Sequence, residues 1–353
     1  MNKIRAWQMS AEKQPFELVE YPFPDLKKGS ALVKIAGCGV CHTDLSFWHY
    51  GVPTRQPLPL VLGHEISGIV TEGSSGLLGQ AVIIPAVIPC GKCDLCRAGR
   101  SNICQAQKMP GNDFNGGFAS HIAVPEQCLV PVPEAALAGI SLEELAVIAD
   151  AVSTPYQVIR KSGLKKGDLA IIIGLGGVGI YAAQLAGILG GNVLALDIST
   201  QKLEQLHLLG LEHSLYIKNL DIKAIKKAVK DKCLEMGAPL NRWKIYEMSG
   251  TRAGQELAFA LLPIAGTLSI VGFTMDKLNL RLSNLMAFDA QIIGTWGCRP
   301  ELYPEVIDLV SRGKLKLKPF TETFALSRIN EIFKKTLNHK LKKRSVLVPD
   351  FQP

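Results

Sequence analysis

The sequence predicts an α/β protein of two domains, a β-rich domain and a doubly wound parallel sheet. At 353 residues the chain is longer than one compact core usually requires. Its first part is rich in proline and glycine, with short β-type runs at Ala31 to Ile35 and Ala81 to Ile84. From about residue 155, apolar strands alternate with helical patterns. We therefore expect one domain over residues 1–154, a second over 155–299, and a return of 300–353 to the first.

The second domain shows the strand signal most clearly. Its strand-like runs are Leu169 to Ile173, Val193 to Leu196 and Thr267 to Val271. Continuous apolar runs of this length are typical of parallel strands that helices cover on both faces. The chain ends in mixed strand and helix, with a last strand-like run at Ser345 to Pro349 that can pair with the first domain.

Composition excludes several classes of protein. Hydrophobic residues make up 47% and charged residues 20%, which is typical of a globular chain and not of a disordered or fibrous one. No charge lies between Asp168 and Asp197, a stretch long enough to cross a bilayer, but its clustered glycines favour a buried strand and helix. We therefore expect no membrane contact. Scattered charges near the start argue against a signal peptide, so we expect a cytoplasmic protein with reduced cysteines.

The chain is basic, with 39 Lys and Arg against 31 Asp and Glu, a net charge of +8. Such an excess attracts phosphorylated ligands as readily as nucleic acid. Most of it lies in three local runs, which we interpret as solvated faces. They are Lys223, Lys226, Lys227, Lys230 and Lys232; Lys314, Lys316 and Lys318; and Lys342, Lys343 and Arg344.

Four cysteines follow the spacing C-x2-C-x2-C-x7-C, at Cys90, Cys93, Cys96 and Cys104. Four thiolates this close in sequence can surround one tetrahedral zinc ion. They leave no open coordination position, so the predicted zinc is structural. A zinc protein that binds nucleic acid is a rival interpretation, but it leaves the next motif unexplained, and we expect no nucleic-acid partner.

A glycine-rich loop with the pattern G-x-G-x-x-G lies between a strand and a helix. Its glycines are Gly174, Gly176, Gly177 and Gly179. Such glycines allow a tight turn and a close approach of the backbone to a pyrophosphate at the helix N-terminus. Asp197 ends the next strand, where a carboxylate accepts hydrogen bonds from the adenosine ribose and repels a 2′-phosphate. The predicted cofactor is NAD, and the alternative is a glycine-rich turn without a nucleotide.

A third set of residues is scattered along the sequence, and each fragment alone is only a weak indication of a metal site. Cys41 lies in Gly39-Val40-Cys41-His42-Thr43-Asp44, Gly63-His64-Glu65 follows, and Asp150 comes much later. A single histidine in such a fragment is more often a core or surface group than a ligand.

Together, and in this order, the three sets resemble the zinc-containing medium-chain alcohol dehydrogenase family over essentially the whole chain. The resemblance implies a GroES-like catalytic domain interrupted by a Rossmann domain. It also implies that Cys41, His64 and Asp150 hold a catalytic zinc, that Glu65 can enter the metal shell, and that the cysteine lobe holds the second zinc. Cys41 thiolate and Asp150 carboxylate neutralise Zn²⁺, and a fourth position stays open for water or substrate.

The resemblance assigns roles to the residues around this zinc. Asp44 is a hydrogen-bond acceptor for His64, and the Thr43 hydroxyl takes the proton of the alcohol. Many relatives have a histidine five residues after the catalytic cysteine to pass that proton to solvent. Here Ser46 stands in its place and can pass a proton but cannot store one near neutral pH. His49 is an alternative for that step.

Further positions match cofactor contacts of the family. His42 and Arg299 match contacts to the phosphates, and Lys202 matches a ribose contact beside Asp197. The remaining predicted cofactor contacts are Val178, Thr154 and Val271. Exposure to solvent is the alternative for Lys202 and Arg299.

Four stretches are similar to one subgroup of the family, the dehydrogenases of 6-hydroxycyclohex-1-ene-1-carbonyl-CoA in anaerobic aromatic degradation. They are 37–44, 62–70, 83–90 and 107–113. This implies oxidation of a ring secondary alcohol of a CoA thioester, a ligand that suits a positive net charge. The alternatives are a zinc dehydrogenase for a simple secondary alcohol or polyol, an additional hydratase activity at the same zinc, and a nicotinamide-binding sensor without turnover. The family further implies a homotetramer, with a dimer as alternative.

Overall fold

The computed structural model describes residues 3–351 and divides the chain into two compact units. One unit comprises the residues up to Ser153 and those from Gly297 onward, and the other comprises Thr154–Trp296. The first boundary thus falls after 153 where 154 was expected, and the second after 296 where 299 was expected. Each unit is described below by itself.

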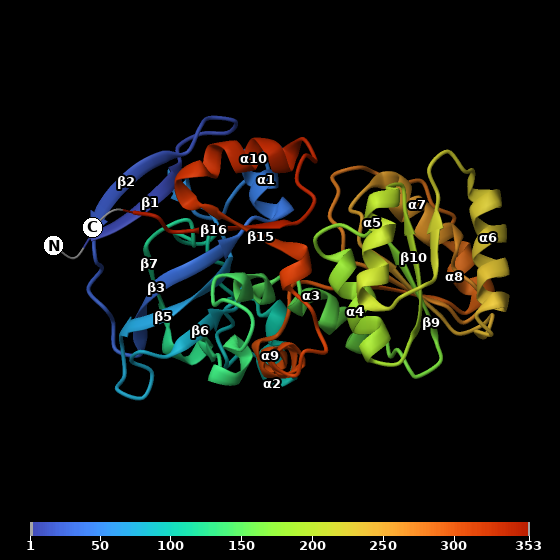
Figure 1. Cartoon of the computed structure of the whole chain (residues 1–353), viewed down its shortest axis with the longest axis horizontal. Coiled ribbons are helices and arrows are strands. Elements are labelled where there is room, and N and C mark those ends of the chain that lie inside the picture. Colours follow the sequence, from blue (N-terminus) through green and yellow to red (C-terminus); the bar gives the residue numbers. More distant parts are fainter. Residues whose placement is uncertain (1–2, 352–353) are drawn as a thin grey trace. The chain divides into compact units, whose positions relative to one another are not determined.

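The first unit is built mainly of antiparallel strands (Figure 1). Its strands are β1 (Lys3–Met9), β2 (Glu17–Pro22), β3 (Ser30–Gly39), β4 (Leu60–Val61), β5 (Glu65–Glu72), β6 (Ala81–Ile84), β7 (His121–Pro125), β8 (Val130–Pro131), β15 (Thr321–Ala325) and β16 (Arg344–Val348). Its helices are α1 (His42–Trp48), α2 (Asp94–Arg97), α9 (Tyr303–Ser311) and α10 (Ile329–Leu337). The two β-type runs expected near residues 31 and 81 are confirmed as parts of β3 and β6.

The end of the chain joins the sheet of the first unit, as its strand-like tail predicts. The strand order is β15-β16-β3-β5-β6-β8, with β7 also paired to β3. Strand β16 runs antiparallel to β3 and places Val346 opposite Gly39. Strand β5 flanks β3 on its other side and places Glu65 opposite the same glycine. Residues from opposite ends of the sequence therefore meet across the end of β3.

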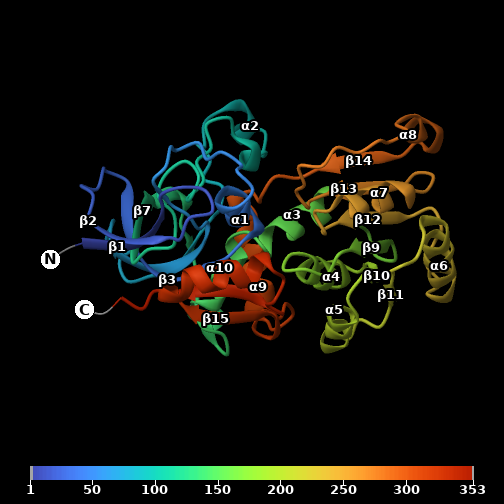
Figure 2. The same cartoon turned by 90° about the horizontal axis from the view of Figure 1, so that it is seen from above.

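The second unit is a six-stranded parallel sheet with the order β11-β10-β9-β12-β13-β14 (Figure 2). Its strands are β9 (Leu169–Ile173), β10 (Asn192–Asp197), β11 (Ser214–Tyr216), β12 (Trp243–Glu247), β13 (Thr267–Ile270) and β14 (Gln291–Gly294). Its helices are α4 (Gly179–Ile188), α5 (Thr200–Glu204), α6 (Ile222–Glu235), α7 (Arg252–Ala260) and α8 (Ser283–Phe288), while α3 (Ser153–Lys161) spans the boundary.

Burial on both faces explains why this sheet reads as continuous apolar runs. All five residues of β9 are buried. Leu169, Ile171 and Ile173 point to one face and form a core cluster with residues of α6 and α7. Successive side chains of a strand point to opposite faces, so Ala170 and Ile172, which are also buried, point to the other face. The uncharged stretch before Asp197 is therefore a buried strand and helix, as expected. Among residues 3–351, none of the helices has the length and apolarity that a membrane span requires.

Candidate functional site

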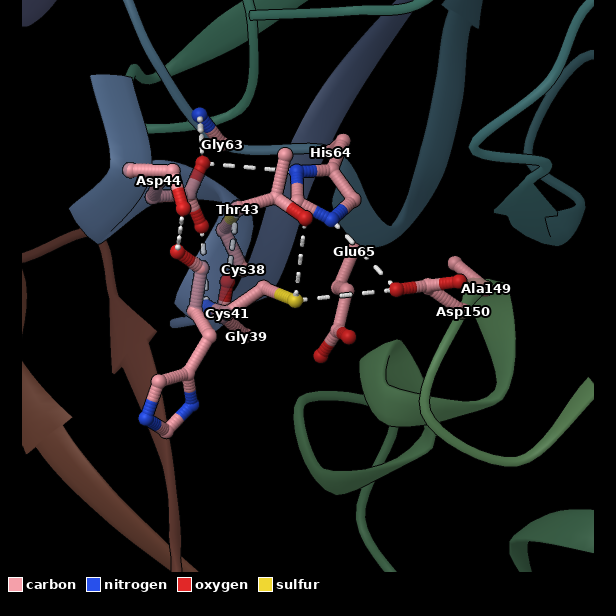
Figure 3. A network of polar contacts seen from close by, with 12 residues as sticks. Cys38, Gly39, Cys41, Thr43, Asp44, Gly63, His64, Glu65, Ala149 and Asp150 are labelled. Carbon is pink, nitrogen blue, oxygen red and sulfur yellow. Dashed lines mark hydrogen bonds and ion pairs between the residues drawn. The ribbon is translucent and has the colours of Figure 1, made fainter. Parts of the chain in front are cut away.

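Three predicted zinc ligands and their acidic neighbour converge in the first unit (Figure 3). Ligand atoms of Cys41, His64, Glu65 and Asp150 all lie within 4.8 Å of one another. The Asp150 carboxylate Oδ2 lies 3.6 Å from Cys41 Sγ and 3.5 Å from His64 Nε2. The sequence separates Asp150 from Cys41 by about a hundred positions, so it is the fold that brings them together.

The Asp44 carboxylate contacts three residues at or beside this cluster. Asp44 is the third residue of α1, and its Oδ2 accepts the N–H of Cys41 at 2.9 Å, which fixes the start of the helix. Its Oδ1 accepts the N–H of Gly63 at 3.2 Å and lies 3.3 Å from His64 Nδ1 (Figure 3). Asp44 is wholly buried, so these contacts satisfy a carboxylate that burial would otherwise penalise. The two side chains are thus close, and the hydrogen bond from His64 to Asp44 stays a prediction.

The ligand atoms at this cluster suit a zinc ion. His64 is 1% exposed, and neither ring nitrogen makes a well-formed hydrogen bond, although carboxylates lie near both. Burial lowers the pKa of His64, but the charge of Asp44 and the close polar contacts with Asp150, Asp44 and Cys41 outweigh that effect and raise the pKa. The cluster therefore favours positive charge at its centre. One thiolate, one imidazole and one carboxylate form a donor set with the fourth position free, as catalytic zinc requires.

The segment before α3 holds Asp150 in place. Asp150 follows the 3-10 helix η4 (Glu144–Ala149), whose last five residues are all buried. The buried Tyr303 of α9 donates its hydroxyl hydrogen to the carbonyl of Ala149, the residue before Asp150. Burial raises the pKa of Tyr303, which keeps the phenol a hydrogen-bond donor. No sequence motif points to this role of Tyr303.

A buried ion pair ties Glu65 to the far end of the chain. Arg344 Nε donates to Glu65 Oε2 at 2.8 Å, and Nη2 donates to Oε1, with side-chain exposures of 5% and 0%. Glu65 and Arg344 lie on the strands that flank β3, and Gly39 between them leaves room for the pair, since a Cβ there would overlap Glu65. The interpretation of Arg344 as part of a solvated basic run is therefore wrong, whereas Lys342 and Lys343 are exposed as expected.

The predicted relay residues lie on α1 in unequal positions. Thr43 Oγ1 lies 3.7 Å from Cys41 Sγ, beside the cluster (Figure 3). Ser46 lies one turn further along the helix, and its hydroxyl donates to the carbonyl of His42 at 2.9 Å. The ring of His49 packs beside Trp48 and Tyr50, with centroids 5.8 Å and 5.1 Å away. A relay role for Ser46 or His49 stays a prediction.

The cysteine lobe forms a second metal site. Sulfur atoms of Cys90, Cys93, Cys96 and Cys104 all lie within 4.8 Å of one another. Hydrogen bonds from the N–H groups of Lys92 and Cys93 lower the pKa of Cys90 to about 6, whereas burial raises that of Cys96 to about 12. Four sulfurs at this spacing fit one tetrahedral zinc, which deprotonates its thiol ligands.

Three glycines of the predicted cofactor loop differ in their geometry. Gly174 has φ +89°, a left-handed conformation, and a Cβ there would lie 2.9 Å from Ser249. A Cβ on Gly179 would overlap the carbonyl of Gly174, so that glycine permits close packing of α4 on the loop. A Cβ on Gly176 would meet nothing within 4 Å. The space at Gly176 suits a pyrophosphate that approaches the backbone.

Asp197 fixes the same loop from β10. Its Oδ2 accepts the N–H of Leu175 at 2.7 Å, and its Oδ1 accepts the N–H of Ser199 at 2.8 Å. Lys202 Nζ lies 3.9 Å from Asp197 Oδ2, with 47% of its side chain exposed. A carboxylate in this place can accept the ribose hydroxyls of NAD through its remaining lone pairs.

The other predicted cofactor contacts are spread over both units. Gly177 and Val178 complete the loop, with Val178 as N-cap of α4, and Val271 follows β13. Thr154 is 9% exposed in α3. His42 is exposed, and its ring lies 6.3 Å from that of His339. Arg299 Nη1 donates to the carbonyl of Gly99 in the cysteine lobe at 3.0 Å. Cofactor contacts by these residues stay predictions.

Replacing Gly176 with alanine tests the loop. The new methyl group meets open space, so we expect the free energy of unfolding to change by less than about 1 kcal/mol. The same methyl group would obstruct the pyrophosphate and raise the dissociation constant of NADH at least about tenfold. Fluorescence titration and thermal unfolding measure the two quantities. Unchanged NADH affinity would contradict the assignment of Gly176.

Comparisons with known proteins show which family the chain belongs to. The family described as alcohol dehydrogenase GroES-like domain matches residues 27–134, and that described as zinc-binding dehydrogenase matches residues 177–312. An alcohol dehydrogenase of Geobacillus stearothermophilus is 32% identical over 351 residues, 98% of each chain. A sorbitol dehydrogenase of Halalkalibacterium halodurans is 25% identical and covers 90% of this chain and 91% of its own.

Solved structures show the same fold. The alcohol dehydrogenase of Aeropyrum pernix has a TM-score of 0.85 at 27% identity, covering 98% of this chain and all of its own. The acetophenone reductase of Geotrichum candidum, solved in complex with NAD, also has a TM-score of 0.85 at 27% identity, covering 99% of each chain. The predicted combination of a GroES-like domain and a Rossmann-type sheet is confirmed, as are zinc and NAD as its cofactors. The chain belongs to the zinc-containing medium-chain alcohol dehydrogenase family.

Proposed function

We propose that the chain oxidises a secondary alcohol to a ketone with NAD as hydride acceptor, at the cluster of Cys41, His64 and Asp150. The observation that carries this proposal is the convergence of those three side chains, with both nitrogens of the buried His64 lacking well-formed hydrogen bonds. Zinc bound there supplies a Lewis acid that lowers the pKa of a bound hydroxyl group. The combined charge of one thiolate and one carboxylate balances the ion.

The chain's own residues divide the remaining work. Asp44 orients the His64 ring through Nδ1, which leaves Nε2 directed toward Cys41 and Asp150. Thr43, beside Cys41, accepts the alcohol proton on its hydroxyl oxygen and passes on its own hydrogen. Arg344 holds the Glu65 carboxylate beside the cluster. The glycine loop binds the NAD diphosphate, and Asp197 favours NAD over NADP.

The substrate in this proposal is a ring alcohol of a CoA thioester, 6-hydroxycyclohex-1-ene-1-carbonyl-CoA. Its support is the likeness of the four sequence stretches around Cys41, His64, Cys90 and Met109 to that subgroup, together with a net charge of +8. Exposed lysines such as Lys342 and Lys343, between α10 and β16, are the kind of cationic group that CoA phosphates require, although no individual residue is assigned to CoA. A simple secondary alcohol or a polyol is the rival, which the names of the curated relatives favour.

Substrate comparison separates the two. We expect anaerobic NAD reduction with the CoA thioester to have a kcat/KM at least about a hundredfold above that with free cyclohex-2-en-1-ol, because remote binding energy raises kcat/KM. The N-acetylcysteamine thioester is the matched control, since it keeps the ring and thioester but lacks the phosphates. Equal efficiencies for all three would reject the CoA substrate and leave an alcohol dehydrogenase for simple alcohols.

We also propose that the chain forms a homo-oligomer through the edge of its parallel sheet. Strand β14 is the last strand of the sheet, and its burial pattern is largely exposed. Exposed apolar side chains lie on this strand and in the segments that connect it to β13 and to the other unit, namely Phe273, Met275, Leu282, Met286, Ile292 and Trp296. An exposed edge strand with apolar neighbours suits pairing with a second copy. Light scattering should give at least twice the mass of one chain, and Ile292→Lys should reduce it.

A further inference from the structure

A buried carboxylate, Glu247, ends strand β12 with 0% exposure. Its Oε1 accepts the N–H of Ser249 at 2.8 Å, the N–H of Gly250 at 3.2 Å and the Ser249 hydroxyl. Its Oε2 is equally buried and has no hydrogen-bond partner within residues 3–351. A buried carboxylate with one bare oxygen is less stable than a neutral side chain of similar shape. Stability alone therefore gives no reason for a glutamate here.

Glu247 connects the loops that follow β12 and β13. Its carbonyl oxygen accepts the N–H of Val271 at 3.1 Å and the N–H of Gly272 at 3.0 Å. The two loops touch backbone to backbone, because a Cβ on Gly272 would overlap Gly250 and would lie 2.8 Å from Glu247 Oε2. From α7, the Gln255 amide donates to the Gly272 carbonyl at 3.1 Å. One residue thus fixes both loops at the carboxyl edge of the sheet.

The loop after β12 also packs against the glycine loop of the cofactor site. A Cβ on Gly174 would lie 2.9 Å from Ser249, and a Cβ on Gly179 would lie 3.3 Å from Met248 Cβ. The N–H of Met248 donates to the carbonyl of Ile173 at 2.9 Å. The loops that follow β9, β12 and β13 are therefore in contact with one another, and the buried Glu247 lies under them.

The sheet order shows which half of NAD this surface faces. Strand β9 lies between β10 and β12, the point where the strand order reverses and where dinucleotides bind across such sheets. Asp197 places the adenosine ribose on the β10 side. The other half of the dinucleotide then extends over the carboxyl ends of β12 and β13, where the two loops held by Glu247 lie.

We propose that the Glu247 side chain is a positioning group for the nicotinamide half of NAD, because it holds the loop at 248–251, against which the loop at 271–273 packs. Its full burial keeps it from touching the cofactor, so its effect passes through the backbone of these loops. Burial raises the pKa of Glu247, and hydrogen bonds from Ser249 and Gly250 oppose that shift. Buried carboxyls with perturbed pKa values concentrate at functional sites.

Truncated cofactors test this role. Glu247→Leu removes the acceptor, so we expect the dissociation constant of NADH to rise about tenfold, a typical effect of losing such a network. ADP-ribose lacks the nicotinamide, so its dissociation constant should change by less than about twofold. Glu247→Gln keeps the Oε1 acceptor and should restore NADH affinity to within about threefold of wild type. These titrations need no alcohol, so they are independent of the proposed substrate.

Asp168 provides a matched control. It is a buried carboxylate at the opposite, amino end of β9, where Arg242 and the N–H of Lys165 bind it. Asp168→Asn should lower the melting temperature while leaving both dissociation constants unchanged. An equal loss of affinity for NADH and ADP-ribose in Glu247→Leu, or no loss of NADH affinity in that variant, would overturn the proposal.

Discussion

Replacing Arg344 with leucine is expected to lower the free energy of unfolding by about 3–5 kcal/mol, because it leaves the Glu65 carboxylate buried without its partner. Glu65 has 0% side-chain exposure, and its two oxygens accept from the Arg344 guanidinium. Gly39, which lies opposite Glu65 on β3, has no side chain that could donate a hydrogen bond in place of Arg344. Urea unfolding of the zinc-loaded protein measures the loss.

Two variants control that measurement. Arg312 pairs with Asp308 at 2.8 Å on the surface, with exposures of 64% and 50%, so Arg312→Leu should cost less than about 1 kcal/mol. The double variant Glu65→Leu with Arg344→Leu removes both charges and should recover most of the stability lost by Arg344→Leu alone. A loss in Arg344→Leu no larger than that in Arg312→Leu would show that the buried pair is not as described.

The second large effect concerns Asp150. We expect Asp150→Asn to lower kcat at least about a thousandfold. The substitution removes the carboxylate that helps to hold and neutralise zinc, and several kcal/mol of transition-state stabilisation depend on that ion. NADH affinity should remain, because the glycine loop and Asp197 belong to a different compact unit. Steady-state NAD reduction and NADH fluorescence titration provide the two values.

Asp308→Asn is the matched control for Asp150→Asn, since it makes the same chemical change at an exposed position of the same unit. It should leave kcat within about twofold of wild type. Retention of wild-type kcat in Asp150→Asn would remove Asp150 from the site. Loss of NADH binding in the same variant would indicate a general structural defect.

Local sequence was sufficient for much of the fold and for two of the sites. The run at Leu169 to Ile173 is apolar because both faces of the strand are buried, and it forms β9 with those bounds. The cysteine lobe and the glycine loop lie within short segments, so their spacing alone places their ligands together. The grouping of Cys41, His64 and Asp150 could be predicted only from the resemblance to a family, because these residues are far apart in the sequence and meet only in the tertiary structure.

Other features were beyond the reach of the sequence for physical reasons. Arg344 follows two exposed lysines, and its burial depends on pairing of β16 with β3 and on the space over Gly39. Glu247 lies in no chemical motif, since its role depends on loops that follow different strands. The Ser46 hydroxyl bonds to its own helix, a local choice that residue type does not determine.

Zinc content measured by elemental analysis tests the central claim most directly. The wild-type chain should hold two zinc ions, one at the cysteine lobe and one at Cys41, His64 and Asp150. Cys41→Ala should hold one zinc ion with its cysteine lobe intact, and its NADH affinity should equal that of the wild type. A wild-type chain with a single zinc, or a Cys41→Ala variant that still holds two, would contradict the assignment of the catalytic metal site.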